Sequence, residues 1–250
     1  MKKVIVCDLD GTLAESKSTL TESMAHVIWQ VLETHYFAVI SGGGWPQFEK
    51  QFLSPLNMSI YSKNDFLKNL LLFPTSGSAC WKYTADEWKK VYSNELSIED
   101  REQILNAFKQ SIPASGVEIP ASSYGDIIED RGSQITFSGR GQLAPLDVKT
   151  VWDPDQNKRR KIIVELQKHI PQYDINIGGM TTIDITQKGI NKAYAIRKIE
   201  DIVGIKKEDI VFIGDALYPG GNDEKAKEAG VECIQVSGPV ETEKILQSLI

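Results

Sequence analysis

The sequence lacks the features that mark several large classes of protein. Its 250 residues include only three cysteines and three histidines, and 34 acidic residues outnumber 28 lysines and arginines, for a net charge of −6. The cysteines lie far apart and two stand in apolar segments, so we expect neither a disulfide framework nor a thiolate metal site. A net acidic chain offers no basic face to a nucleic-acid backbone, so no nucleic-acid partner is expected.

Long hydrophobic runs are also absent. The first apolar segment, residues 3–7, is interrupted by Asp8, too early for a signal-peptide core or a membrane span. No G-x-G-x-x-G pattern follows it, which argues against a nucleotide-binding dehydrogenase. With 41% hydrophobic and 25% charged residues the composition is that of a globular protein, and we expect a cytoplasmic protein with no membrane partner.

Short β-branched runs alternate with amphipathic segments at both ends of the chain. The pattern predicts strands at 3–7, 37–40, 210–213 and 231–236 and helices at 21–33, 45–52, 191–200, 224–228 and 240–249. Strands that alternate with helices predict an α/β fold with a doubly wound, Rossmann-like parallel sheet.

The middle of the chain has a different pattern. Helices are predicted from Ser97 and over 155–169, with strands at 134–137, 173–177 and 181–185, the last two joined by a glycine turn. We therefore predict a discontinuous core, 1–84 plus 187–250, and an inserted α+β cap domain at 85–186.

The hexapeptide DLDGTL, Asp8 to Leu13, follows the first predicted strand directly. Open α/β sheets bind ligands beyond the carboxyl ends of their strands, and two carboxylates placed there need a compensating cation or proton. Asp8 is then free to attack phosphorus, and Asp10 can transfer protons to and from the oxygens that leave and enter. Gly11 permits a sharp turn and Thr12 can bind the turn or the phosphate. The alternative is that both aspartates are only turn and capping residues.

With this motif at the end of its first strand, the chain resembles the haloacid dehalogenase superfamily, whose members transfer phosphoryl groups through an aspartyl intermediate. The resemblance implies a hydroxyl residue after the second strand, supplied by Ser41 with Gly42 beside it for phosphate. It also implies a catalytic lysine, for which Lys192 fits better than Lys188. An acidic loop completes the set: Asp215 would join Asp8 and the Asp10 backbone carbonyl as ligands of Mg²⁺, with Asn222 and Asp223 supporting them.

The mixed cap is similar to that of type II, subclass B members, and within that group the chain most closely resembles the eukaryotic-type phosphomannomutases. GGMTTIDITQKGINK (178–192) matches that family's GG-x4-D-x7-K spacing, GDALYPGGND (214–223) matches GD-x3-PGGND, and Arg131-Gly132 with the strand QITF resembles RG-x-FIEF. The resemblance implies that Arg131, Lys17, Lys149 and Arg140 bind the non-reacting phosphate and that Asp184 binds a sugar hydroxyl. Since Lys17 and Lys149 stand where the family has arginine, the bidentate fork is missing there.

We therefore expect a magnesium-dependent phosphotransferase acting on a phosphorylated sugar, with a phosphatase as the leading hypothesis. The alternatives are a phosphomannomutase that interconverts hexose 1- and 6-phosphates, and an inactive phosphosugar-binding protein that kept the fold. An aromatic cluster, Trp81, Tyr83, Trp88 and Tyr92, has a spacing that we interpret as helical. That interpretation favours the interior of the cap or a homodimer face over a sugar-stacking surface.

Overall fold

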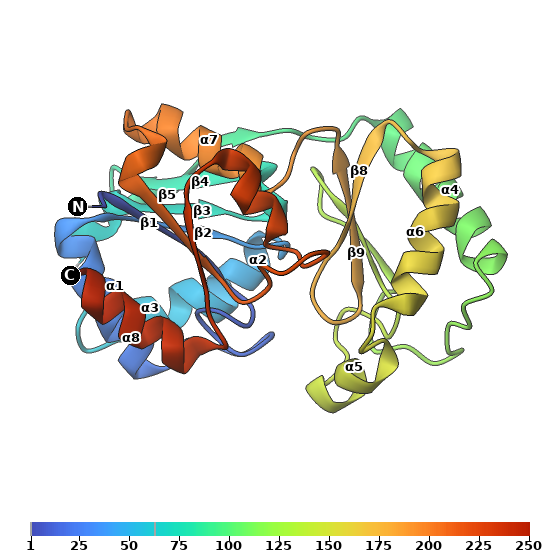
Figure 1. The fold of residues 1–250 in the computed structure, drawn as a ribbon, viewed down its shortest axis with the longest axis horizontal. Coiled ribbons are helices and arrows are strands. Elements are labelled where there is room, and N and C mark those ends of the chain that lie inside the picture. Colours follow the sequence, from blue (N-terminus) through green and yellow to red (C-terminus); the bar gives the residue numbers. More distant parts are fainter. Residues whose placement is uncertain (1, 63) are drawn as a thin grey trace. The chain divides into compact units, whose positions relative to one another are not determined.

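The computed structural model describes residues 2–62 and 64–250, and the chain forms two compact units (Figure 1). The first unit contains the chain up to Ser93 and from Asn191 to Ile250, and the second contains Asn94–Ile190. The cap predicted at 85–186 therefore has the wrong limits, because the residues that follow 84 return as another strand of the core sheet.

The first unit is built on a seven-stranded sheet in the order β11-β10-β1-β2-β3-β4-β5. The first five of these strands are parallel to one another, and β4 and β5 continue the sheet through antiparallel pairings, β3 with β4 and β4 with β5. This is the predicted doubly wound α/β sheet, extended at one edge. The strands are β1 (Val4–Asp8), β2 (Tyr36–Ile40), β3 (Leu70–Phe73), β4 (Ala79–Thr84), β5 (Glu87–Ser93), β10 (Ile210–Gly214) and β11 (Glu232–Gln235).

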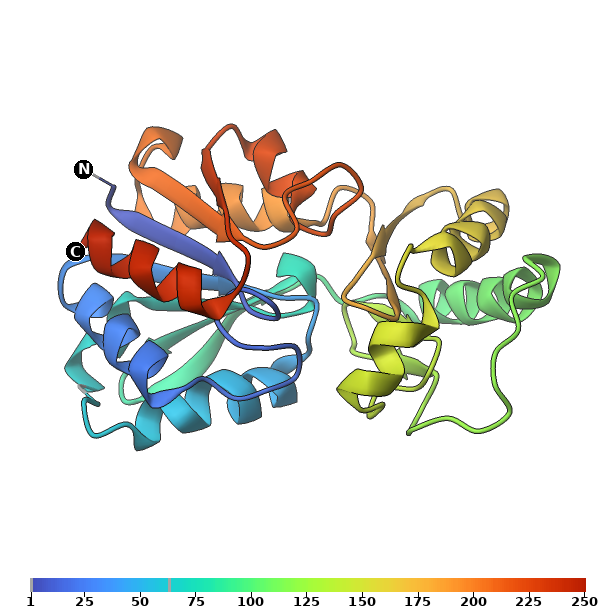
Figure 2. The same ribbon diagram turned by 60° about the horizontal axis from the view of Figure 1, so that its bottom comes forward.

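Helices cover both faces of this sheet, as Figures 1 and 2 show for α7 and α8 on opposite faces. The α-helices are α1 (Glu22–Thr34), α2 (Trp45–Phe48), α3 (Ser54–Met58), α7 (Lys192–Val203) and α8 (Pro239–Leu249). A π turn, Glu49–Leu53, joins α2 to α3. Short 3₁₀ segments are found at Asn64–Asn69, Thr75–Gly77, Lys207–Asp209 and Glu224–Ala229, where the last replaces the predicted helix at 224–228.

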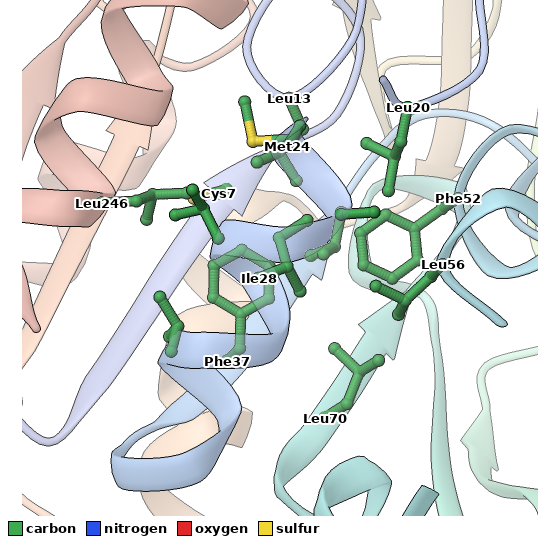
Figure 3. Close-up of a cluster of buried hydrophobic side chains, with 14 of the residues drawn as sticks. Cys7, Leu13, Leu20, Met24, Ile28, Phe37, Phe52, Leu56, Leu70 and Leu246 are labelled. Atoms are coloured by element: carbon green, nitrogen blue, oxygen red, sulfur yellow. The ribbon is translucent and has the colours of Figure 1, made fainter. Parts of the chain in front are cut away.

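The alternation of side chains along β1 explains why helices pack on both faces of the sheet. Ile5 and Cys7 pack in the cluster that includes α1, α3 and α8, whereas Val4 and Val6 pack in the cluster that includes α7. Figure 3 shows the first cluster, in which side chains from α1, from the π turn and from α8 surround the strands. Burial on both faces holds the carboxyl end of β1 rigidly.

The second unit is an antiparallel sheet in the order β6-β7-β9-β8 packed on helices. Its strands are β6 (Ile128–Asp130), β7 (Ile135–Ser138), β8 (Tyr173–Ile177) and β9 (Thr182–Gln187), and its helices are α4 (Ile98–Ala114), α5 (Leu146–Trp152) and α6 (Asn157–His169). Ser97 caps α4 with the predicted capping box. Odd-numbered residues of β7 and β9 pack on α4 and α6, and even-numbered ones give a polar face.

The aromatic cluster is not helical. Trp81 and Tyr83 lie on β4, and Trp88 and Tyr92 lie on β5, so all four belong to the core hairpin rather than to a cap. Tyr83 pairs directly with Trp88 across the hairpin. Within residues 2–62 and 64–250, no helix is both long enough and apolar enough to cross a membrane.

Candidate active site

Asp8 ends β1 at the carboxyl edge of the parallel sheet. The register places Asp8 opposite Ile40 of β2 and Cys7 opposite Ile213 of β10. Two neighbouring strands therefore deliver their following residues, Ser41 and Asp215, to the same edge. All five residues of β1 are buried, and the Asp8 side chain itself is only 3% exposed.

Lys192 joins two buried carboxylates. Its ammonium donates a 2.5 Å bond to Asp8 Oδ1 and a second, short bond to Asp223 Oδ1. Burial lowers the pKa of this lysine, but the carboxylates of Asp223 and Asp8 more than offset that effect and raise its pKa above the usual value. The lysine therefore stays charged. Its position is fixed by Asn191, whose side chain caps α7 by accepting bonds from the backbone at the helix start.

The second oxygen of Asp8 has no hydrogen-bond partner among the described residues, although it is fully buried. Burial raises the pKa of the Asp8 carboxyl, Lys192 lowers it, and the nearby carboxylates of Asp223 and Asp215 raise it again, leaving the pKa well above the usual range. One lysine thus does not compensate three carboxylates.

Asp8, Asp215 and Asp223 each offer an oxygen, and these atoms lie within 4.8 Å of one another. Carboxylate oxygens are the ligands that Mg²⁺ prefers, and a divalent cation would balance the carboxylate charge that Lys192 leaves uncompensated. The residues present therefore fit the predicted metal. Lys188, in contrast, is mostly exposed and pairs with Asp174 at 3.3 Å.

Thr12 fixes Asp215 instead of standing free for phosphate. Its hydroxyl accepts a 3.0 Å bond from the Asp215 backbone N–H and donates a 3.3 Å bond to the carboxylate. Gly11, with φ of +88°, makes the turn that brings them together, and a Cβ at this position would lie 2.7 Å from Asp215 Oδ2. The DLDGT loop and the acidic loop are thereby locked to each other.

Asp10 is held by two glutamine side chains, which were not among the predicted site residues, and by the backbone of Lys17. Gln51 Nε2 donates to Asp10 Oδ1 at 3.0 Å and Gln47 Nε2 donates to Oδ2 at 2.8 Å. The backbone N–H of Lys17 adds a 2.6 Å bond to Oδ1. The side chain of Lys17 bonds Gln47 Oε1 at 2.5 Å, so this predicted phosphate ligand belongs to the surroundings of Asp10. The signal for these residues in the sequence is that two glutamines stand four residues apart.

Ser41 begins the glycine-rich loop after β2. It is buried, and its hydroxyl accepts a 3.1 Å bond from the Gly43 backbone N–H. Backbone bonds from Ser76 to Ser41 and from Thr75 to Gly43 tie the loop to the segment after β3. Gly42 lies between two residues whose backbone carbonyls are hydrogen-bonded, so the conformation of the loop is set without a ligand. A phosphate site built from backbone N–H groups requires such a loop.

The remaining predicted residues lie in the second unit. Asp184, on β9, is 5% exposed and accepts a 2.8 Å bond from the Thr136 hydroxyl, so its carboxylate is buried and hydrogen-bonded. Arg131 binds Glu129 through both Nε and Nη2, and Arg140 lies 6.0 Å from the ring of Tyr124. Lys149 is buried on α5.

Five of the predicted residues thus form one connected cluster at the sheet edge: Asp8, Thr12, Lys192, Asp215 and Asp223. Asp223 also accepts a 3.0 Å bond from the Ala216 backbone, which closes the acidic loop on itself. Asn222 is half-buried beside it. A nucleophilic oxygen, a fixed ammonium and a set of carboxylates together have the chemical elements of phosphoryl transfer to an aspartate.

Comparison with known proteins places this arrangement among enzymes. A family model described as eukaryotic phosphomannomutase matches residues 24–250. A phosphomannomutase from Drosophila melanogaster is 24% identical over 253 residues, covering 99% of this chain and 95% of that protein. One from Encephalitozoon cuniculi is 25% identical over 255 residues, covering 99% of this chain and 94% of that protein.

Two solved structures show the shared fold. N-terminally truncated, IMP-bound IMP-nucleotidase from Plasmodium falciparum matches with a TM-score of 0.72 at 17% identity, covering 99% of this chain and 68% of that one. A haloacid dehalogenase-like hydrolase from Bacteroides thetaiotaomicron matches with a TM-score of 0.64 at 16% identity over the whole of both chains. Both likenesses cover nearly the whole of this chain, so the fold of both units is one known from solved structures.

Proposed function

The chain belongs to the eukaryotic phosphomannomutase family of the haloacid dehalogenase superfamily, and from that premise we propose that it interconverts hexose 1- and 6-phosphates. The family match favours this isomerisation over the hydrolysis that the lysines at arginine positions had suggested. The observation that carries the proposal is the Asp8 carboxylate. One of its oxygens is bonded to Lys192 and the other has no hydrogen-bond partner among the described residues, so we assign this second oxygen to the attack on phosphorus.

In the first half-reaction Asp8 attacks one phosphorus of a bound hexose 1,6-bisphosphate. The new bond joins the phosphoryl group to a carboxylate oxygen, the P–O bond to the sugar breaks, and Asp10 gives its proton to the departing oxygen. Lys192 and the backbone of the Ser41–Gly42 loop oppose the charge of the transferred group. The products of this step are an aspartyl-phosphate and a hexose monophosphate with one free hydroxyl.

In the second half-reaction the free hydroxyl at position 1 or 6 of a bound hexose monophosphate attacks the phosphorus of the aspartyl-phosphate, which forms the bisphosphate again. Asp10 takes the proton of that hydroxyl, and Asp8 leaves as a carboxylate. Mg²⁺ held by Asp8, Asp215 and the backbone carbonyl of Asp10 would supply further positive charge at the transferred phosphoryl group. Asp223, supported by Asn222, keeps Lys192 in its place beside Asp8.

The inserted unit provides the residues that we assign to substrate recognition. Arg131, Arg140 and Lys149 supply positive charge for a second phosphate, and Asp184 supplies a buried acceptor for a sugar hydroxyl. Lys17 is assigned the same role in the first unit. Because the aspartyl-phosphate of a mutase must react with a bound hexose monophosphate and not with water, recognition of the non-reacting phosphate decides between isomerisation and hydrolysis.

A phosphatase remains the second candidate, and Lys17 and Lys149 are the observation that favours it. An ammonium binds phosphate as a point charge without the two-pronged geometry of a guanidinium, so the intermediate would be released more easily. Water would then take the place of the sugar hydroxyl in the second half-reaction.

The two candidates are separated by following one substrate to two products. Purified protein is incubated with Mg²⁺, mannose 1-phosphate and a catalytic amount of mannose 1,6-bisphosphate, and both mannose 6-phosphate and inorganic phosphate are measured. We expect mannose 6-phosphate to form faster than phosphate. Phosphate release without isomerisation would replace the mutase with the phosphatase, and neither product over a panel of phosphosugars would leave only a binding role.

A further inference from the structure

We propose that Gln47 and Gln51 are positioning residues for Asp10, an inference that rests on the proposed function and adds two residues to its machinery. Both side chains donate to the Asp10 carboxylate, and Gln47 Nε2 also donates to Gln51 Oε1 at 2.8 Å. They therefore act as one unit on the group assigned to proton transfer.

The orientation of both carboxamides is determined by their neighbours. Lys17 Nζ can only donate and a carboxylate can only accept, so Gln47 must turn its Oε1 to the lysine and its NH₂ to Asp10. Gln51 receives the Gln47 donor on Oε1 and must likewise turn its NH₂ to Asp10. A chain of this kind holds the carboxylate in one direction.

The hydrogen bonds also select one atom of Asp10 for proton transfer. A carboxylate oxygen has two lone pairs, and both on Oδ1 are taken, by the backbone N–H of Lys17 and by Gln51. Oδ2 accepts one bond, from Gln47, among the described residues. We therefore assign the remaining lone pair of Oδ2 as the site that holds the transferred proton.

The backbone is built to present these two side chains. Phe48, at the end of α2, and Phe52, within the π turn Glu49–Leu53, anchor the helical run in the core (Figure 3 shows Phe52). The same π turn includes Gln51, which is only 3% exposed. Single π turns within helices often occur at functional sites. Gly43 packs against the Gln47 carboxamide so closely that a Cβ at position 43 would collide with it.

The proposal can be measured because the rate enhancement from general acid catalysis depends on the leaving group. A sugar alkoxide needs a proton as it departs, whereas p-nitrophenolate departs without one. Misplacing Asp10 should therefore slow phosphorylation of Asp8 by a sugar phosphate and leave phosphorylation by an aryl phosphate nearly unchanged. A loss of general stability or of Asp8 geometry would slow both.

The test compares Gln47→Met, which keeps the length of the side chain but removes its hydrogen bonds, with the parent protein. Single-turnover phosphorylation is measured with Mg²⁺ present, once with mannose 1,6-bisphosphate and once with p-nitrophenyl phosphate. We expect the rate with the bisphosphate to fall by about 10- to 100-fold, the usual cost of a misplaced catalytic group. The rate with the aryl phosphate should fall by less than about threefold.

Gln51→Met is measured in parallel and should show the same asymmetry, and Gln30→Met, at an exposed position of α1, is the matched control. Equal slowing of both substrates by Gln47→Met, or no slowing of either, would overturn the positioning role while leaving the proposed function in place. A parent protein that neither compound phosphorylates would overturn the proposed function and, with it, the assignment of Gln47 and Gln51.

Discussion

The two sheets differ in the polar groups that are buried beside them. At the carboxyl edge of the first sheet, four charged side chains, Asp8, Lys192, Asp215 and Asp223, are crowded together, and carboxylates exceed cations. On the polar face of the second sheet, the buried groups are mostly neutral hydroxyls of β7 and β9, among which Asp184 is hydrogen-bonded to Thr136.

This difference indicates that the two units have different roles. Buried like charges cost free energy, and such clusters gather at functional sites, so we interpret this edge of the sheet as the place of the proposed reaction. Neutral hydroxyls cost little once they are hydrogen-bonded and match the hydroxyls of a sugar. We therefore expect substitutions in the first unit to affect turnover and substitutions in the second to affect substrate affinity.

The largest effect is expected from Asp8→Asn. An amide cannot attack phosphorus, so turnover of p-nitrophenyl phosphate and of phosphosugars should fall by roughly 10⁴-fold or more. Phosphate release is measured at saturating substrate. Asp86→Asn, at an exposed turn residue with φ of 62° that asparagine tolerates, is the control. Activity equal to that of the parent would remove Asp8 from the role of nucleophile.

Lys192→Met tests whether the charged cluster depends on its cation. Two buried carboxylates, Asp8 and Asp223, lose their partner, which should cost about 3–5 kcal/mol of unfolding free energy. Urea denaturation without divalent ions measures this cost. Lys198→Met on the same helix is the control and should change stability by less than about 0.5 kcal/mol.

The same variant has a predicted pH dependence. The pKa of Asp8 is already raised by burial and by neighbouring carboxylates, and loss of Lys192 removes the influence that lowers it. Because the pKa of Asp8 is higher in the folded than in the unfolded state, its contribution to the free energy of unfolding is fully present at low pH. That contribution is lost as pH rises through the folded pKa. The deficit of Lys192→Met should therefore be smaller at about pH 5 than at about pH 8. The opposite trend would contradict this account of the cluster.

Asp184→Asn tests the polar face. The amide oxygen can still accept from Thr136, so unfolding free energy should change by less than about 1 kcal/mol. The KM for a hexose phosphate should rise by about tenfold, since a hydrogen bond to a charged acceptor is lost, whereas turnover of p-nitrophenyl phosphate should be unchanged. Asp147→Asn, on the exposed start of α5, is the control. Equal loss with both substrates would place Asp184 outside sugar recognition.

The sequence predicted those parts of the molecule that depend on neighbouring residues. A short apolar run places Asp8 at a strand end, and Asn191 caps the helix that begins with Lys192, so both positions follow from local signals. The parallel sheet was predicted correctly from the alternation of strands and helices. What the local signals cannot supply is the distance between residues far apart in the chain.

The hairpin of β4 and β5 was misread for a different reason. Trp81 and Tyr83 alternate with polar residues, which is a strand pattern, and Ala85 and Asp86 adopt the positive φ of a tight turn. The spacing from Trp88 to Tyr92 suggested a helix more strongly. Gln47 and Gln51 were overlooked because two glutamines one turn apart are usually exposed, and the π turn that buries Gln51 leaves no clear mark in the sequence.

The smallest effect is expected from Lys17→Arg, which sharpens the comparison because Lys17 lies in the first unit but is assigned to recognition. The residue is exposed and already bonded to Gln47, and an arginine can keep that contact while offering phosphate a second parallel donor. Steady-state isomerisation should show the KM for mannose 1,6-bisphosphate lowered by about threefold at unchanged kcat, with less phosphate released per turnover. The matched control is Lys2→Arg, far from the site and paired with Glu232. A change in kcat alone would instead assign Lys17 to the support of Asp10, through Gln47, and remove it from phosphate binding.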